Sequence, residues 1–345
     1  MYKLFRSLLF QLDPEVAHHL TLQLMRIGGT QPFNSLLKTF YAAPSQPVEA
    51  FGLTFKNPIG LAAGYDKDGI AVRGLSTLGF GHIEVGTVTP RPQPGNPKPR
   101  VFRLVKDEAV INRMGFPGKG MDYVSWSLRG ALKGQRGNLP VIGINLGKNK
   151  DTPLEEAASD YISLIRAFTA LADYLTINIS SPNTVGLRRL QGREMLEQLL
   201  GAIEKEREQI MLGRGGHCPI LVKLAPDLID EELDDALGVI LDTGMDGIIA
   251  TNTTLARDGL RSARQGEMGG LSGSPLRFQS EAMLEKIVRR VDGRVPIVSV
   301  GGIMSSEDAK RRLDMGATLI QVYTGLIYRG PGLVKSILQS LASAS

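Results

Sequence analysis

The segment Asn178-Ile-Ser-Ser-Pro-Asn183 carries the side chains with the clearest chemical potential in the chain. Two asparagines flank a pair of serines, directly after the β-branched and apolar residues 174–177. An asparagine amide offers both a donor and an acceptor, which suits a planar amide or imide ligand. Pro182 restricts the backbone and is expected to hold Ser181 in one orientation. The same residues also fit an ordinary Ser-Pro-Asn turn, so the segment alone leaves both interpretations open.

A repeating pattern of strand, glycine-rich turn and helix must position this segment. Short β-branched and apolar runs predict strands, and charged segments with a leucine or isoleucine stripe predict helices between them. Eight alternating strands favour an α/β fold of the (β/α)8 TIM barrel type over a doubly wound sheet, because no Gly-x-Gly-x-x-Gly follows the first strand. The predicted strands are residues 59–63, 82–87, 141–146, 174–179, 220–224, 247–251, 297–300 and 319–323. The predicted helices are residues 154–171, 194–211, 231–241 and 280–291, with a further capped start at Ser305.

Side chains at the carboxyl ends of these strands are expected to share one face of the barrel, where barrel enzymes have their active sites. Amide and hydroxyl groups dominate this rim. They suit a flat hydrogen-bonding ligand, and the carboxylate and imidazole clusters of a metal site are missing. Gly301-Gly302 and Thr324-Gly325 follow the seventh and eighth strands, where many barrels bind phosphate.

Two lysines on the rim have competing interpretations. Lys67 lies in a glycine-rich loop and could bind an anionic substrate. Lys223 lies among apolar neighbours in the fifth strand, where an unpaired ammonium is costly. It could form a Schiff base, as in barrel aldolases, or hold positive charge against a reduced cofactor. A lyase, an oxidoreductase and a non-catalytic phosphate-binding protein therefore all stay open at this point.

Residues 1–44 do not follow the barrel pattern, and they predict a two-helix extension before a barrel of residues 45–345. The first helix has an apolar stripe with Lys3 and Arg6 beside it, and the second begins at Asp13-Pro14. Such helices either pack on the domain as a lid or lie on a membrane surface. Between the second and third strands, an insertion contains a predicted small β-hairpin of residues 101–105 and 109–112.

Composition narrows the class of protein further. The net charge of +5, from 40 Lys+Arg and 35 Asp+Glu, mildly favours an anionic partner, and the basic residues are too scattered to indicate nucleic acid. The single cysteine, Cys218, excludes a disulfide within the chain and indicates a reducing compartment. No apolar run reaches about 18 residues, so no membrane-spanning helix is predicted.

Six short motifs are together far more specific than any one of them. They are Ala62-Ala-Gly-Tyr-Asp-Lys67, Asn112-Arg-Met-Gly-Phe116, Asn178-Ile-Ser-Ser-Pro-Asn183, Ala250-Thr-Asn-Thr-Thr254, Gly270-Leu-Ser-Gly273 and Val300-Gly-Gly302. In this order they resemble the motifs of class 2 dihydroorotate dehydrogenases, the quinone-dependent, membrane-associated enzymes. The resemblance covers essentially the whole chain, including the N-terminal helices. Class 1 relatives carry cysteine where this chain has Ser181, which favours class 2.

The resemblance implies a flavin mononucleotide (FMN) enzyme that oxidises dihydroorotate to orotate in pyrimidine biosynthesis. Ser181 would remove the C5 proton while the C6 hydride passes to FMN, and a membrane quinone would reoxidise the flavin. A monomer is implied at the cytoplasmic face of the cell membrane, held peripherally to an anionic surface by its N-terminal helices.

The same resemblance assigns residues to three sites. FMN would be held by Ala63, Gly64, Tyr65, Asp66, Lys67, Thr87, Asn145, Asn178, Lys223, Thr251, Gly273, Gly302, Tyr323 and Thr324. Substrate would be held by Lys67, Asn112, Arg113, Met114, Gly115, Phe116, Asn178, Asn183, Asn252 and Thr253. The quinone site would contain His18, Arg103 and Tyr323.

Two positions depart from the family pattern, Tyr65 in place of another bulky apolar residue and Pro117-Gly118 after Phe116. They touch no catalytic group and affect only the fine packing of substrate. The alternatives are a class 1-like enzyme with a soluble electron acceptor and a flavin-free lyase or aldolase that depends on Lys223.

Overall fold

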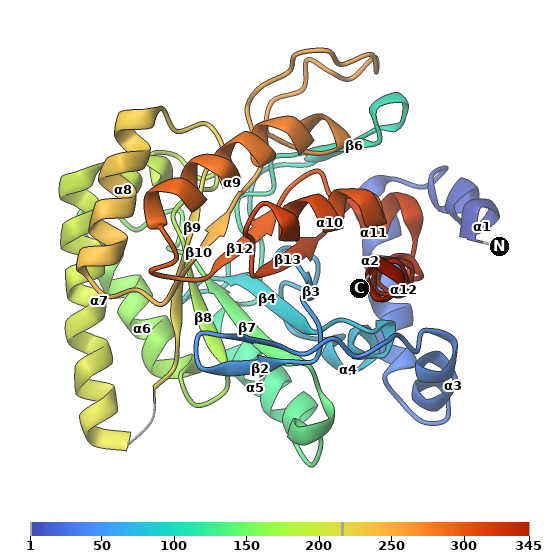
Figure 1. Cartoon of the computed structure of the whole chain (residues 1–345), viewed down its shortest axis with the longest axis horizontal. Helices are drawn as coiled ribbons and strands as arrows, with labels where there is room; N and C mark the ends of the chain where they lie inside the picture. The colour runs from blue at the N-terminus through green and yellow to red at the C-terminus, as the bar shows by residue number, and fades with distance from the viewer. Residues whose placement is uncertain (1, 215–216, 345) are drawn as a thin grey trace.

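The barrel is present in the computed structural model, which describes residues 2–214 and 217–344 (Figure 1). Eight parallel strands close in the order β10-β12-β13-β3-β4-β7-β8-β9. They are β3 (Ile59–Leu61), β4 (His82–Val88), β7 (Val141–Leu146), β8 (Tyr174–Asn178), β9 (Ile220–Leu224), β10 (Gly247–Ala250), β12 (Ile297–Val300) and β13 (Leu319–Val322). All eight predicted strands are confirmed, with ends that differ by at most two residues.

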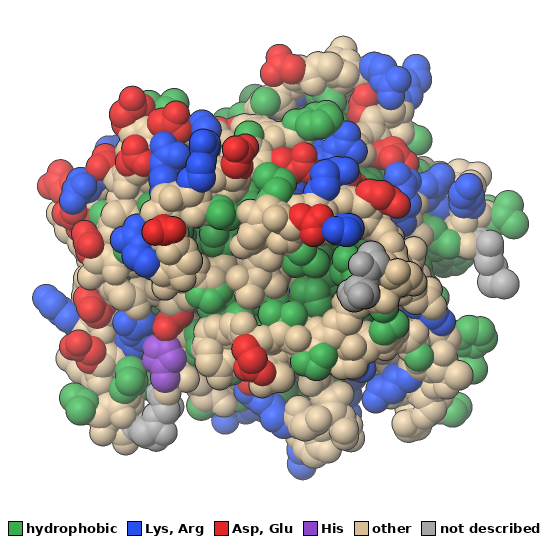
Figure 2. Space-filling model, viewed as in Figure 1, with side chains coloured by type: hydrophobic (Ala, Val, Ile, Leu, Met, Phe, Trp, Pro, Cys, Tyr) green, Lys and Arg blue, Asp and Glu red, His purple; other side chains and the backbone are tan. Residues whose placement is uncertain are grey.

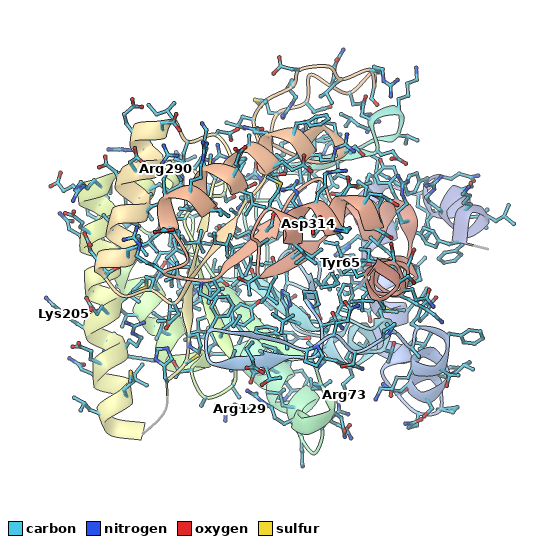
Figure 3. All side chains as sticks on the ribbon, viewed as in Figure 1. Tyr65, Arg73, Arg129, Lys205, Arg290 and Asp314 are labelled. Atoms are coloured by element: carbon cyan, nitrogen blue, oxygen red, sulfur yellow. The ribbon has the colours of Figure 1, made fainter. Side chains whose placement is uncertain are left out.

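Helices surround the barrel as the alternating pattern requires. The four predicted helices correspond to α6 (Ala157–Phe168), α7 (Arg193–Arg214), α8 (Asp230–Asp242) and α9 (Arg277–Val291). The predicted cap is also confirmed, because Ser305 Oγ accepts the N–H of Asp308 at 3.2 Å at the start of α10 (Ser306–Asp314). The other α-helices that follow the first barrel strand are α4 (Val72–Leu75), α5 (Gly120–Leu132), α11 (Thr324–Arg329) and α12 (Leu333–Ala344). Tyr65, near α2, and Lys205, on α7, lie on opposite sides of the barrel (Figure 3).

Three helices rather than two precede the barrel: α1 (Tyr2–Leu9), α2 (Pro14–Gly28) and α3 (Phe33–Phe40). The start of α2 is as predicted, with the Asp13 carboxylate accepting the N–H groups of Glu15 and Val16 at 2.9 and 3.1 Å. The third helix was not predicted, although its apolar residues at positions 33, 36, 37 and 40 have helical spacing. All three helices expose large apolar side chains to solvent.

The predicted hairpin belongs to a larger sheet. Strands β5 (Val101–Leu104) and β6 (Ala109–Asn112) pair antiparallel, and β11 (Gly270–Gly273) adds to the other edge of β6. The short β11 has glycine at both ends, so it carries no strand pattern in the sequence. A further hairpin, which was not predicted, is formed by β1 (Val48–Ala50) and β2 (Leu53–Phe55). Its apolar side chains pack against the amino ends of the barrel strands.

His82 is an uncompensated polar group in the barrel core. Its ring lies edge-on to Phe55 and Tyr174, at centroid distances of 5.4 and 6.3 Å, and neither ring nitrogen has a hydrogen-bond partner in the described part of the chain. Burial lowers the pKa of His82 from 6.5 to about 3. The unfolded chain therefore binds a proton at higher pH than the folded chain does. The corresponding stability is complete above about pH 6.5 and is lost as the pH falls below it.

We expect His82→Leu to make the free energy of unfolding less sensitive to acid. When the pH falls from 6.5 to 5, His82 lowers the free energy of unfolding of the wild type by about 2 kcal/mol, since one pKa unit equals about 1.4 kcal/mol. The variant lacks this loss. Denaturant unfolding at both pH values measures the difference. His19→Leu, on the exposed side of α2, is the matched control and should behave like the wild type. An unchanged acid sensitivity in His82→Leu would contradict the prediction.

Candidate active site

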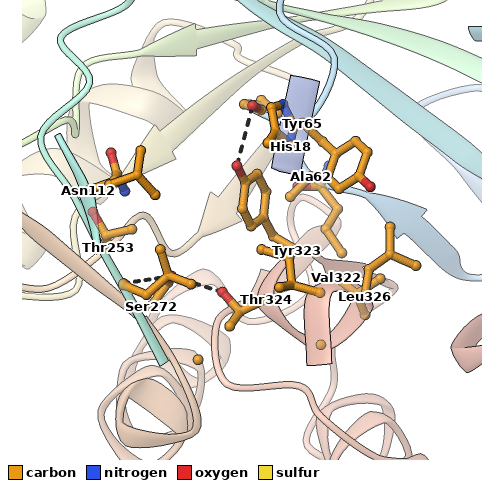
Figure 4. Close-up of a pocket in the computed structure, with 18 of the residues that line it drawn as sticks. His18, Ala62, Tyr65, Asn112, Thr253, Ser272, Val322, Tyr323, Thr324 and Leu326 are labelled. Atoms are coloured by element: carbon orange, nitrogen blue, oxygen red, sulfur yellow. Dashed lines mark hydrogen bonds between the residues drawn. The ribbon is translucent and has the colours of Figure 1, made fainter. Parts of the chain in front are cut away.

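One cavity of about 330 Å³ lies at the carboxyl ends of the barrel strands and extends beneath α1 and α2. Its inner part is lined by polar side chains that include Asn112 and Thr253, and its outer part by rings that include His18, Tyr65 and Tyr323 (Figure 4). The polar and the aromatic parts therefore belong to a single continuous space.

Most of the predicted site residues line this cavity. They are His18, Ala63, Gly64, Tyr65, Lys67, Thr87, Arg103, Asn112, Met114, Gly115, Phe116, Asn178, Ser181, Asn183, Lys223, Thr251, Asn252, Thr253, Gly273, Gly302, Tyr323 and Thr324. Asp66, Arg113 and Asn145 do not line it. The topology thus brings together residues from the ends of seven barrel strands, all except β7, with residues of the inserted sheet and the N-terminal helices.

Asp66 and Arg113 lie behind the cavity wall. The Asp66 carboxylate accepts the N–H groups of Ile70 and Ala71 at 3.0 and 2.8 Å, so it shapes the loop that carries Lys67. Burial raises the pKa of Asp66 to about 6, even though these backbone donors favour the carboxylate. The Arg113 guanidinium instead forms an ion pair of 2.7 Å with Glu267.

The floor of the cavity is a network of amides and hydroxyls. Asn145 Oδ1 accepts hydrogen bonds from Thr87 Oγ1 at 2.5 Å and from Asn178 Nδ2 at 2.9 Å. Asn178 Nδ2 also donates to Thr87 Oγ1 at 3.0 Å. The ladder between β4 and β7 shifts register between Gly86 and Val88, and Thr87 occupies this irregularity. These contacts fix the orientation of the amides that face the cavity.

The two adjacent serines have different surroundings. Ser180 Oγ donates to Asn178 Oδ1 at 3.1 Å and accepts from Asn252 Nδ2 at 3.0 Å, so it belongs to the floor network. Ser181 lines the cavity, and its Oγ accepts only the N–H of Asn183, at 3.2 Å. No described residue accepts the Ser181 hydroxyl hydrogen, which leaves this hydroxyl available to a ligand or a water.

Lys67 supplies positive charge to the cavity. Its Nζ donates to the carbonyl of Gly64 at 2.7 Å and makes no ion pair within the described chain. Burial lowers the pKa of Lys67 to about 8, and the nearby carboxylates of Glu15 and Asp68 limit the decrease. An anionic ligand that reaches Nζ would therefore find a desolvated, unpaired cation.

Lys223 is the second buried cation of the cavity wall. Its Nζ lies 3.9 Å from Oε1 of Glu84, which is too far for a hydrogen bond. Burial lowers the pKa of Lys223, and the negative charge of Glu84 opposes the decrease. The expected cost of a buried ammonium is thus reduced by a buried carboxylate in the same barrel.

A tight turn after β12 lies where phosphate was predicted to bind. Gly302 has a φ of 71°, and a Cβ there would lie 2.3 Å from Cα of Arg277, so the turn has no room for a side chain. Arg312, which is fully buried, supports the turn from below by donating to the carbonyl of Gly301 at 2.8 Å. Across the cavity wall, Thr324 at the start of α11 donates to Ser272 Oγ at 2.8 Å.

The outer part of the cavity is aromatic. The His18 ring lies edge-on to Tyr65 at 5.0 Å, and Tyr65 lies edge-on to Tyr323 at 5.8 Å (Figure 4). The pKa of His18 is lowered to about 3, mainly by burial and also by the positive charge of Lys67, so the ring is neutral. Arg103 donates to the carbonyls of Leu9 and Leu12, which fastens the turn between α1 and α2 to β5.

Four further polar residues line the cavity without having been predicted: Glu15, Thr21, Ser272 and Gln321. Thr21 lies one helical turn after His18, so helical spacing could have indicated it. Ser272 falls within the motif at residues 270–273, and Gln321 is the one polar residue of the otherwise apolar strand β13. A polar residue in a strand buried on both faces is the available signal.

Comparison with known proteins identifies the family. The family model described as dihydroorotate dehydrogenase matches residues 46–344. A protein of Azotobacter vinelandii named Dihydroorotate dehydrogenase (quinone) is 47% identical over 344 residues, which cover 99% of this chain and 97% of the relative. A protein of the same name from Pseudomonas fluorescens is 48% identical over 345 residues, covering 99% of both chains.

A solved structure gives the same result at the level of the fold. The crystal structure described as DHODH in complex with ferulenol from Eimeria tenella superposes with a TM-score of 0.88 and 40% sequence identity. The match covers 96% of this chain and 91% of that chain. The resemblance of the six motifs is thereby confirmed over the full length. The chain belongs to the dihydroorotate dehydrogenase family, in its quinone-dependent class.

Proposed function

We propose that this protein oxidises dihydroorotate to orotate in pyrimidine biosynthesis and delivers the electrons through bound FMN to a membrane quinone. The single cavity that joins a polar floor to an aromatic mouth carries the proposal. A polar substrate and a lipophilic acceptor can each reach the same cofactor there. Family membership argues against the flavin-free lyase on Lys223, and the quinone-dependent relatives argue against a soluble acceptor.

The cavity wall fits FMN. Gly302, Gly273 and Thr324, at the start of α11, line the cavity, and glycine turns and helix starts of this kind offer backbone N–H groups to a phosphate. The floor amides and Lys223 offer hydrogen bonds and charge to a flat ring system. We assign to FMN Ala63, Gly64, Tyr65, Lys67, Thr87, Asn178, Lys223, Thr251, Gly273, Gly302, Tyr323 and Thr324, with Asp66 and Asn145 supporting them from behind. Bound FMN would supply the hydride-accepting chemistry that no side chain has.

The polar floor fits a planar imide that carries a carboxylate. Asn112, Asn178, Asn183 and Asn252 offer paired donors and acceptors, and Lys67 offers a positive charge. We propose Ser181 as the base that removes the C5 proton of dihydroorotate. A serine hydroxyl is a weak base, so its own hydrogen has to leave through a water or another relay in a closed site.

The aromatic mouth fits a quinone that arrives from a lipid surface. We propose that residues 1–44 form the quinone- and membrane-facing extension, with His18 and Tyr323 along the path and Arg103 holding the helices in place. The side chains of Leu4, Leu8 and Phe40 are 77%, 64% and 64% exposed. In Figure 2, apolar side chains gather over α1 and α3, whereas charged side chains dominate over α7 and α8.

These features support peripheral attachment rather than insertion. None of the helices in the described chain is both long and apolar enough to cross a bilayer. The exposed leucines would enter the lipid interface, with Lys3 and Arg6 beside them to attract anionic headgroups. We propose a monomer bound in this way at the cytoplasmic face of the cell membrane.

Flavin spectroscopy tests the proposed function. The purified protein should be yellow, lose its visible absorbance when dihydroorotate is mixed in a stopped-flow instrument, and regain it with a quinone faster than with fumarate or NAD. A colourless protein that cannot be reconstituted with FMN would overturn the proposal. Covalent trapping of a substrate on Lys223 by borohydride would favour the lyase.

We expect Leu4→Asp combined with Leu8→Asp to weaken binding to anionic vesicles and to slow turnover with a lipophilic quinone by about tenfold or more. Each leucine buried in lipid is worth about 1.5–3 kcal/mol, and a charge removes this term. Reduction of FMN by dihydroorotate should not change, because neither side chain lines the cavity. Leu212→Asp, at an 89% exposed leucine on α7, is the matched control and should leave both measurements unchanged. Vesicle binding equal to that of the wild type would contradict the proposed membrane face.

A further inference from the structure

The centre of the barrel holds a carboxylate to which the proposed reaction assigns no role. Glu84 of β4 is fully buried and does not line the cavity. Its Oε2 accepts hydrogen bonds from Gln321 Nε2 at 2.8 Å, Tyr174 OH at 3.1 Å and Thr176 Oγ1 at 3.4 Å. Its Oε1 accepts from Asn145 Nδ2 at 2.8 Å. Side chains of β7, β8 and β13 thus converge on one carboxylate.

Lys223 is the charged group that compensates Glu84. Their 3.9 Å pair is the only ion pair that either residue forms in the described chain, and both side chains are almost completely buried. The other groups around the carboxylate are amides and hydroxyls, and the hydroxyl of Tyr174 is neutral because burial and Glu84 raise its pKa. Removing one member of such a buried pair leaves the other charge uncompensated.

Glu84 also fixes the direction of the Asn145 amide, which lies behind the cavity floor, and through it that of Asn178 on the floor. An ionised carboxylate only accepts hydrogen bonds, so the Asn145 amide must turn its Nδ2 toward Glu84. Asn145 Oδ1 then faces the cavity side and accepts from Asn178 Nδ2 at 2.9 Å. Asn178 Oδ1 in turn faces Ser180, from which it accepts a hydrogen bond at 3.1 Å. Glu84 therefore determines which amide atoms of Asn145 and Asn178 act as donors and which act as acceptors at the cavity floor.

We propose that Glu84 is a positioning residue for the reaction: its buried carboxylate keeps Lys223 as an ammonium beside the flavin and sets the amide orientation of Asn145 and Asn178. This inference rests on the proposed function, because it concerns the side of the cavity that would face FMN. Glu84 touches neither ligand and acts through Lys223 and the two asparagines.

The charge of Lys223 determines how many protons accompany reduction. With Glu84 present, Nζ is charged before and after two electrons reach the bound FMN, so the lysine takes up no proton. Without Glu84, nothing opposes the lowering of the Lys223 pKa by burial, which favours the neutral amine in the oxidised protein. The negative charge gained on reduction then favours the ammonium, and Nζ takes up one proton from solvent for every two electrons.

The midpoint potential of bound FMN, measured as a function of pH, tests this inference. We expect the potential of Glu84→Gln to fall more steeply with pH than that of the wild type, by the slope that one extra proton per two electrons produces. Lys223→Met should keep the wild-type slope, because it has no titrating amine. Adding Lys223→Met to Glu84→Gln should restore that slope. A wild-type slope in FMN-loaded Glu84→Gln would overturn the inference.

Thermal unfolding of the FMN-free protein gives a second test, which applies even if Glu84→Gln does not hold FMN. Each single variant leaves one member of the buried pair without its partner, either as an uncompensated charge or as a group that must be neutralised, so Glu84→Gln and Lys223→Met should each lower the melting temperature. The double variant contains no buried charge at this place and should recover most of the loss. Additive losses in the double variant would overturn the pairing.

These outcomes separate the inference from the proposed function. A wild-type protein that never binds FMN would refute the proposed function, while the unfolding cycle would still report on the pair. A wild-type protein that is reduced by dihydroorotate, combined with an unchanged slope in Glu84→Gln, would refute only the role of Glu84.

Discussion

Ser181→Ala is expected to slow the reduction of bound FMN by dihydroorotate about 10³-fold, because a positioned general base contributes about 10²- to 10⁴-fold to a proton transfer. The Ser181 hydroxyl faces the cavity and has no described acceptor for its hydrogen, so its loss removes the base and leaves the floor network intact. Stopped-flow bleaching of the flavin absorbance measures this step without quinone. FMN content and orotate affinity should stay close to those of the wild type.

Ser180→Ala is the matched control for this prediction. Ser180 holds Asn178 and Asn252 at the floor and does not line the cavity. Its loss should weaken orotate binding more than it slows bleaching at saturating dihydroorotate. Ser181→Cys should recover part of the rate, since a thiol ionises at a pKa of about 8.5. Equal rates of bleaching in Ser181→Ala and the wild type would remove Ser181 from the role of base.

The sequence predicted the barrel well because its strands are buried on both faces. Such strands read as continuous apolar runs, and β7, β9 and β12 begin and end at the predicted residues. The missed elements lack this signal. Strand β11 is bounded by glycines and is defined by its partner β6, which lies far away in the sequence. The β1–β2 hairpin has three-residue strands, and it exists because the barrel offers an apolar end to cover.

The site was predictable to the extent that topology alone decides it. Residues that follow parallel strands meet at one rim, so the sequence alone predicts that Lys67, Ser181 and Asn252 lie together, and all three line the cavity. Which way each side chain points was not predictable. Arg113 turns to Glu267, although its neighbours Asn112 and Met114 line the cavity.

Glu84 shows where inspection of the strand ends stops being informative. It lies in the middle of β4, between Ile83 and Val85, and therefore outside any list of residues at the rim. A single charged residue in a fully buried strand is itself a signal, because its burial requires a partner. The partner, Lys223, comes from β9, and only the closed barrel brings the two strands to the same interior.

Lys67→Met is expected to weaken orotate binding by about 100-fold or more, because losing one partner of a buried charge pair costs about 2–5 kcal/mol. Lys67 makes no ion pair in the described chain, whereas Lys223 is paired with Glu84 and Arg103 donates to the carbonyls of Leu9 and Leu12, so the substrate carboxylate has no equivalent partner. Titration of the FMN-loaded protein with orotate measures the affinity. FMN content has to be measured in parallel, since Lys67 is also assigned to the cofactor.

The pH dependence of orotate binding distinguishes a charge effect from a loss of shape. Burial lowers the pKa of Lys67 to about 8, so the free protein carries the ammonium below this pH and loses it above. Wild-type affinity for orotate should therefore be constant at lower pH and decrease as the pH rises through 8, while the affinity of Lys67→Met should not follow this curve. Lys119→Met is the matched control, because the ammonium of Lys119 lies over the ring of Tyr123 and not in the cavity. Its orotate affinity should change with pH as that of the wild type does. A wild-type pH profile in Lys67→Met would mean that a group other than Lys67 binds the substrate carboxylate. The carboxylate site would then have to be assigned to other residues of the rim.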